Sequence, residues 1–96
     1  MKYRIQIMIE NPENKDENRT LNLKCFFIKD DEGYGKKTYL SIFGEHNPFE
    51  QYIDLRYDKN YHIGQEKEYL EYWAYNYWTG KDGSWEIKSL NITEAK

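Results

Sequence analysis

The spacing of the apolar residues constrains the fold of this chain more than any other feature of the sequence. In residues 3–9 the apolar side chains of Tyr3, Ile5, Ile7 and Ile9 fall on one side, which is typical of a half-buried β-strand. Alternation of the same period predicts four more strands, over residues 20–29, 36–43, 50–57 and 85–93. The last of these runs slips in phase between Ile87 and Leu90, which indicates a bulge near Ser89.

Residues 65–78 follow a helical period instead. A strand would place Glu71 on the same face as Tyr69 and Trp73, whereas a helix leaves that face free of charge. The uncharged helical face would hold Tyr69, Leu70, Trp73, Ala74 and Tyr77. Acidic residues in the first turn suit the positive end of a helix, and Gly80 stands where a C-terminal cap is expected.

The order of these elements along the chain is β-β-β-β-α-β, and it predicts the fold class. Consecutive strands followed by one helix are typical of an α+β domain, with a mostly antiparallel five-stranded sheet and the helix (about residues 65–78) packed on one face. A chain of 96 residues is the size of one domain, so residues 1–96 are expected to form a single unit. Residues 11–19 contain no apolar residue except Pro12, and we expect an exposed loop there.

Aromatic residues are unusually numerous. The chain has ten Tyr, four Phe and three Trp but no Val, so large rings must fill much of the core. A small core cannot satisfy ten buried Tyr hydroxyl groups, and some of these rings are therefore expected at the surface. Tyr is favoured at binding surfaces, so the excess favours a binding protein.

Composition also bears on location and class. The net charge is −3, and the chain has no continuous apolar stretch of the length that a signal peptide or a membrane span needs. We therefore expect a cytoplasmic protein without a membrane partner. Lys outnumbers Arg eleven to three and Ile is abundant, a bias typical of AT-rich genomes that favours a phage or mobile-element origin.

Residues that carry catalysis or bind metals are sparse. Cys25 is the only cysteine, lies in an apolar run and is expected to be a small buried hydrophobe. His46 and His62 are far apart in polar segments, and no phosphate-binding or nucleophile motif is present. We therefore expect neither a cofactor nor an enzyme. The alternative is a small enzyme, because Asp54, Arg56 and Asp58 would share one strand face and shift each other's pKa.

A second alternative is the binding of single-stranded nucleic acid. Four aromatic residues of the predicted strands could form a platform on which bases stack, namely Phe26, Tyr39, Phe43 and Tyr52. The charge pattern argues against it, since residues 45–71 hold seven acids against three bases and residues 1–44 are nearly neutral. Nucleic acid is therefore an improbable partner on sequence grounds.

The helix is the strongest candidate for a binding surface. Acidic and aromatic residues remain on its outer side, namely Glu66, Glu68, Glu71, Tyr72, Tyr75 and Trp78. Exposed rings within a charged rim are typical of a protein-binding patch, unless a loop folds over them. The leading hypothesis is a small acidic binding protein without catalysis. Its partner would be another protein, such as a host nucleic-acid-handling enzyme whose basic groove it inhibits, and a homodimer through sheet edges is a further candidate.

Overall fold

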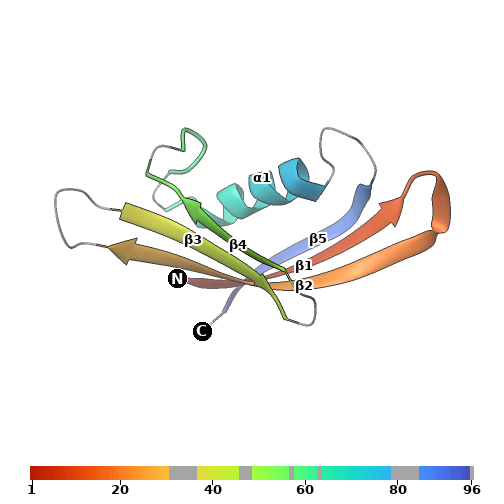
Figure 1. Cartoon of the computed structure of the whole chain (residues 1–96), viewed down its shortest axis with the longest axis horizontal. Coiled ribbons are helices and arrows are strands. Elements are labelled where there is room, and N and C mark those ends of the chain that lie inside the picture. The colour runs from red at the N-terminus through yellow and green to blue at the C-terminus, as the bar shows by residue number, and fades with distance from the viewer. Residues whose placement is uncertain (31–36, 46–48, 57, 63, 79–84, 96) are drawn as a thin grey trace.

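The computed structural model of the chain describes residues 1–30, 37–45, 49–56, 58–62, 64–78 and 85–95. The predicted fold class is confirmed: one antiparallel five-stranded sheet carries one helix, and the elements follow the order β-β-β-β-α-β (Figure 1). In chain order they are β1 Lys2–Asn11, β2 Asn14–Asp30, β3 Lys37–Gly44, β4 Glu50–Asp54, α1 Glu66–Trp78 and β5 Glu86–Ala95.

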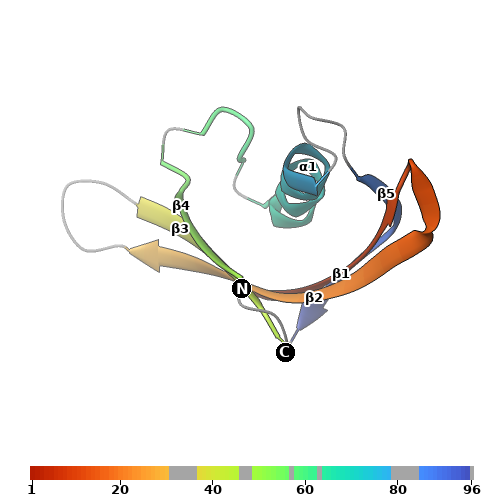
Figure 2. The ribbon, with the colours of Figure 1, turned by 45° about the vertical axis from the view of Figure 1, so that its right-hand side comes forward.

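The sheet order determines where the helix lies. The strands are arranged β4-β3-β2-β1-β5, so the connection from β4 to β5 must pass from one edge of the sheet to the other. Helix α1 makes this passage across the concave face, and the sheet curves around it (Figures 1 and 2). The opposite, convex face carries no helix of the described chain.

The core lies between the concave face and α1. Alternate residues of β1 to β3 point inward, as their spacing predicted, and Ile5, Ile7, Leu40, Ile42 and Leu70 are at most 1 % exposed. The remaining buried apolar side chains of this cluster are Tyr3, Ile9, Leu23, Cys25, Phe27, Leu55, Tyr69, Trp73, Ala74 and Ile92. A single apolar cluster therefore joins β1, β2, β3 and β5 to the helix, and the half-buried Ile53 of β4 packs against it.

Two hydrogen bonds from aromatic side chains of α1 connect the helix to the preceding part of the chain. The Trp73 Nε1–H donates a hydrogen bond to Gln51 Oε1 in β4 at 3.2 Å. The Tyr69 hydroxyl donates to Asp58 Oδ2 at 2.7 Å. Both rings are thus buried while their polar atoms are satisfied, which avoids the cost of an unpaired buried donor.

The predicted loop over residues 11–19 is wrong. Strand β1 continues to Asn11 and β2 begins at Asn14, so the two form a long hairpin that projects beyond the helix (Figure 1). Its outer part pairs Ile9 with Arg19 and Glu10 with Asn18. The prediction of a loop rested on the absence of apolar residues. A hairpin that is exposed on both faces is held by backbone pairing, and this pairing does not require an apolar face.

Strand β4 is shorter than the predicted 50–57. It ends at Asp54, whose Oδ1 accepts a hydrogen bond from the Arg56 backbone N–H at 3.0 Å and so starts a turn. Leu55 remains buried, at 2 % exposure. Strand β5 extends to Ala95, and its predicted bulge near Ser89 is confirmed, since Met8 pairs with Ser89 but Ile9 pairs with Ile87.

Helix α1 matches the prediction within one residue, and its inner face is as expected except at Tyr77. The Tyr77 ring is 47 % exposed, although it stacks on Trp73 with ring centroids 5.3 Å apart. It lies in the last helical turn, where the ring extends past the core. The expected cap at Gly80 lies outside the described residues.

Candidate functional site

The outer side of α1 presents one continuous stripe of side chains. Glu68, Glu71, Tyr72 and Tyr75 stand at positions i, i+3, i+4 and i+7, which lie above one another on a helix. All four are exposed, and the rings of Tyr72 and Tyr75 keep 42 % and 47 % of their surface accessible. The described chain therefore does not fold over these rings. We call these four residues the helix stripe.

Tyr72 is held in place within the helix stripe. Its hydroxyl accepts a hydrogen bond from Asn60 Nδ2 at 3.0 Å, and its ring lies 6.0 Å from the ring of Tyr69. Asn76 Nδ2 also donates to the Tyr72 backbone carbonyl at 2.7 Å. A ring fixed in this way loses little conformational entropy on binding, which favours its use as an anchor.

Two residues predicted for this surface, Glu66 and Trp78, are not part of the helix stripe. Glu66 is only 3 % exposed, so its prediction as a rim residue is wrong. Its Oε1 accepts hydrogen bonds from the Gly64 N–H at 3.3 Å and the Tyr61 hydroxyl at 3.4 Å, and these contacts hold it against the helix N-terminus. Trp78 is the last residue of α1, and its side chain lies outside the described part of the structure.

The electrostatic surroundings of α1 are negative. Burial raises the pKa of Tyr3, and the charges of Glu66, Glu94 and Glu68 raise it further. The pKa of Tyr61 rises to about 12 through burial and the nearby Glu66. Both shifts have a common cause, since a tyrosinate is disfavoured near carboxylates in a desolvated site. The helix side of the molecule therefore carries a local excess of negative charge.

The convex face of the sheet is built differently. The four aromatic residues of the nucleic-acid alternative do come together there, as two stacked pairs. Phe26 and Phe43 stack with centroids 5.5 Å apart, and Tyr39 and Tyr52 stack at 5.1 Å. Tyr52 is 60 % exposed, more than any other large hydrophobic side chain of the described residues.

Three cationic side chains, which were not among the predicted site residues, adjoin these rings. Lys2 pairs with Phe26 across β1 and β2, and its Nζ lies 5.6 Å from the centroid of that ring. Arg4 pairs directly with Lys24. Net charge summed along the chain concealed this cluster, but one signal existed: Lys2 and Arg4 alternate with the inward Tyr3 and so must share the outer face.

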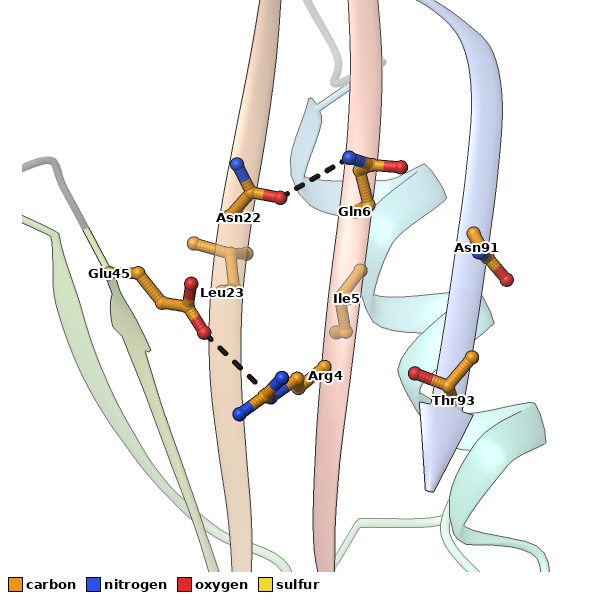
Figure 3. A pocket seen from close by; sticks show the side chains of 8 residues that line it. All are labelled: Arg4, Ile5, Gln6, Asn22, Leu23, Glu45, Asn91 and Thr93. Carbon is orange, nitrogen blue, oxygen red and sulfur yellow. Dashed lines mark hydrogen bonds and ion pairs between the residues drawn. The ribbon is translucent and has the colours of Figure 1, made fainter. Parts of the chain in front are cut away.

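Two shallow pockets lie on this convex face and share Arg4. One, of about 160 Å³, is lined by Lys2, Tyr3, Arg4, Lys24, Phe26 and Ala95. The other, of about 210 Å³, is lined mostly by polar side chains from three strands and from the residue after β3, namely Arg4, Gln6, Asn22, Glu45, Asn91 and Thr93, with Ile5 and Leu23 beneath (Figure 3). In it Gln6 Nε2 donates to Asn22 Oδ1 at 3.4 Å, and Arg4 Nε lies 4.0 Å from Glu45 Oε1.

The predicted charged row of the enzyme alternative does not form a strand face. Asp54 ends β4 and Arg56 lies in the turn, where its guanidinium contacts Asp54 Oδ2 at 3.0 Å. Asp58 instead accepts the hydrogen bond from Tyr69. The turn that begins after Asp54 breaks the alternation that the prediction assumed, so the two carboxylates have separate structural partners.

Other candidate chemistry is equally limited in the described residues. Cys25 is fully buried, and burial raises the pKa of its thiol to about 12, so it stays protonated and is confirmed as a core residue. His46 lies outside the described chain and His62 is exposed. Within the described ranges no three His, Cys, Asp or Glu side chains gather closely enough to hold a metal ion. The one helix described is neither long nor apolar enough to cross a membrane.

Comparison of the chain with protein-family models, with curated proteins and with solved structures finds no match. Function must therefore be argued from the geometry of the two surfaces.

Proposed function

We propose that this chain is a small binding protein without catalysis, and that it docks onto a basic surface of another protein through the helix stripe. The observation that carries the proposal is the exposure of Tyr72 and Tyr75 beside Glu68 and Glu71 on one side of a packed helix. Tyr is enriched among residues that dominate binding energy, and an acidic rim selects a basic partner.

The helix stripe suits a rigid partner surface. Its backbone belongs to a helix whose opposite face is sealed into the core by Leu70, Trp73 and Ala74. Little ordering is then needed on binding, so most of the contact energy appears as affinity. A nucleic-acid-handling enzyme offers a basic groove of this kind. Inhibition of such an enzyme by a phage or mobile-element protein is the biological role that we attach to the proposal.

Affinity capture followed by measured affinities tests the proposal. The immobilised chain is exposed to a bacterial lysate at moderate salt, and a retained protein is purified and titrated with Tyr72→Ala and Tyr75→Ala. Each variant should weaken binding by about tenfold or more, because truncation of a centrally placed aromatic anchor costs about 2 kcal/mol or more. Met8→Ala is the matched control, since Met8 is 43 % exposed on the convex face.

Charge is tested by a second matched pair. Glu71→Gln should slow association and reduce its dependence on salt, whereas Glu13→Gln removes the same charge from the hairpin turn and should change little. Retention of no protein at moderate salt would overturn the proposal. So would a partner whose affinity is unaffected by both Tyr variants, and a self-association that accounts for all binding would reassign the surface to a homodimer.

A further inference from the structure

The convex face combines features that single-stranded nucleic acid requires, and this is independent of the helix stripe. Stacked rings provide flat apolar surfaces, and every nucleic-acid base has a flat face that such rings can bind whatever its sequence. The ring of Tyr52, at 60 % exposure, is the most accessible of them. The rings of Phe26 and Phe43 lie within the same sheet, next to the cations of β1 and β2.

The cations are placed at a cost to the fold. Arg4 and Lys24 face each other directly across two antiparallel strands. Like charges in this position repel and destabilise a sheet. The nearest acidic partner is Glu45, whose carboxylate lies 4.0 Å from the Arg4 guanidinium. In the described contacts this carboxylate compensates Arg4 and not Lys24. An anion above the strands would relieve the repulsion, so the cluster favours a phosphate ligand.

Apart from Glu45, the acids on the same face are set apart from this cluster. Asp54 is held by Arg56, and Glu50 stands at the far strand β4, in register with Phe43. The three cations therefore cluster over one half of β1 and β2. Of the acids, Glu50 and Asp54 lie on β4, Glu45 borders Arg4, and Glu10 and Glu86 lie toward the other end of β1 and β5, where both pair with Lys88. A strand crossing the sheet would thus meet phosphate-binding residues at one end and the stacked Tyr39–Tyr52 pair at the other.

The polar pocket in Figure 3 adds side-chain amides, which are groups able to hydrogen-bond the edges of bases. Gln6, Asn22 and Asn91 come from three adjacent strands and bring their side-chain amides to one hollow beside Arg4. An amide offers both a donor and an acceptor, which is the complement of a base edge or a ribose hydroxyl. A bare charged patch would not supply this group of donors and acceptors.

We propose that the convex face of the sheet binds single-stranded nucleic acid, with Lys2, Arg4 and Lys24 on its phosphates and the rings of Phe26, Phe43 and Tyr52 on its bases. Base stacking and a few phosphate contacts must supply the affinity, since the whole chain carries a charge of −3. With three cations, the logarithm of the association constant should fall with the logarithm of salt with a slope of about −2.

Fluorescence anisotropy with labelled oligo(dT) and oligo(U) of about ten nucleotides tests the proposal at roughly 50 mM salt. Tyr52→Ala should weaken binding by roughly 5- to 100-fold, the range expected for loss of one stacking platform. Lys24→Glu should weaken it about tenfold or more and flatten the salt slope. Met8→Ala is the control for the loss of an exposed apolar side chain on the same face.

Lys67→Glu is the matched charge control, because Lys67 is exposed on the helix and the change in net charge is identical. It should alter affinity by less than about threefold. The proposal is overturned if neither oligonucleotide binds at low salt, or if Lys67→Glu weakens binding as much as Lys24→Glu does. Binding of duplex DNA as tightly as of the single-stranded oligonucleotides would also overturn it. So would equally tight binding of poly-Glu if Tyr52→Ala has no effect on oligonucleotide binding.

Discussion

The concave and convex faces of the sheet are made from alternate residues of the same strands, yet they differ in their physical character. On the concave side Leu40 and Ile42 of β3 are fully buried beneath α1. On the convex side Tyr39 and Phe43 of the same strand are only half-buried, and their rings stack on neighbours in the sheet. One face stabilises the fold, and the other is available for contact.

Charge separates the two sides as well. Acidic residues gather around α1, where they raise the pKa of Tyr3, while Lys2, Arg4 and Lys24 gather on the convex face. A small chain with a modest net charge can thus carry a local cluster of cations on one side and a group of acids on the other. Net charge, taken over the whole chain, is therefore a poor guide to which partners each face attracts.

The largest expected effect compares two residues of β3. Leu40→Ala should lower the free energy of unfolding by about 2–5 kcal/mol, because it leaves a cavity in the core. Phe43→Ala should cost less than about 2 kcal/mol, since it removes a half-buried ring and its stacking on Phe26. Urea unfolding measures both, and equal costs would show that the convex face is a second core.

High pH should weaken the helix side first. The pKa of Tyr61 and of Cys25 is raised to about 12, and burial and Asp58 also raise that of Tyr69. A raised folded-state pKa stabilises the fold fully below the ordinary values of 9.0 for Cys and 10.0 for Tyr, and this contribution is lost as pH rises toward 12.

Urea unfolding between pH 8 and 12, with tyrosinate absorbance recorded in parallel, checks this expectation. Tyr61 and Tyr69, whose pKa values are raised by burial, should ionise only as the chain unfolds. Ionisation of Tyr61 and Tyr69 in the folded protein at the ordinary tyrosine pKa would contradict their burial.

The buried carboxylate of Glu66 offers an effect of intermediate size. Glu66→Ala should cost about 1–3 kcal/mol of stability, because the Gly64 N–H and the Tyr61 hydroxyl lose their acceptor. Glu66→Gln keeps an acceptor oxygen and should cost less. Both variants should lower the pKa of Tyr61 in an absorbance titration, and an unchanged pKa would show that Glu66 contributes nothing to the negative surroundings.

The smallest effect is a gain in stability. Lys24→Gln removes the repulsion between Lys24 and Arg4, and it should raise the free energy of unfolding by about 0.2–1 kcal/mol at low salt. The gain should vanish at about 1 M salt, where charges are screened within roughly 3 Å. A loss of stability, or a gain independent of salt, would show that the two cations do not repel each other.

The sequence predicted parts of both surfaces. The helical period placed Tyr72 and Tyr75 outside, and their exposure is confirmed because the opposite stripe holds Leu70 and Trp73 in the core. The strand period grouped Phe26 and Phe43 on one face, but it did not show that Lys2 and Lys24 lie beside them. Glu66 was misplaced because a helical period alone does not reveal a preceding segment, with Tyr61 and Gly64, folding over the first turn.

The sequence by itself determined the strand and helix periods, the order of the elements and the inward rows of apolar residues. These follow from local geometry, since side chains alternate along a strand and repeat every third or fourth residue on a helix. Only the tertiary structure decided the length of the β1–β2 hairpin, the burial of Glu66 and the cluster of Lys2, Arg4 and Lys24. Each of these depends on which distant residues are paired across strands, and that register is fixed by the assembled sheet and core.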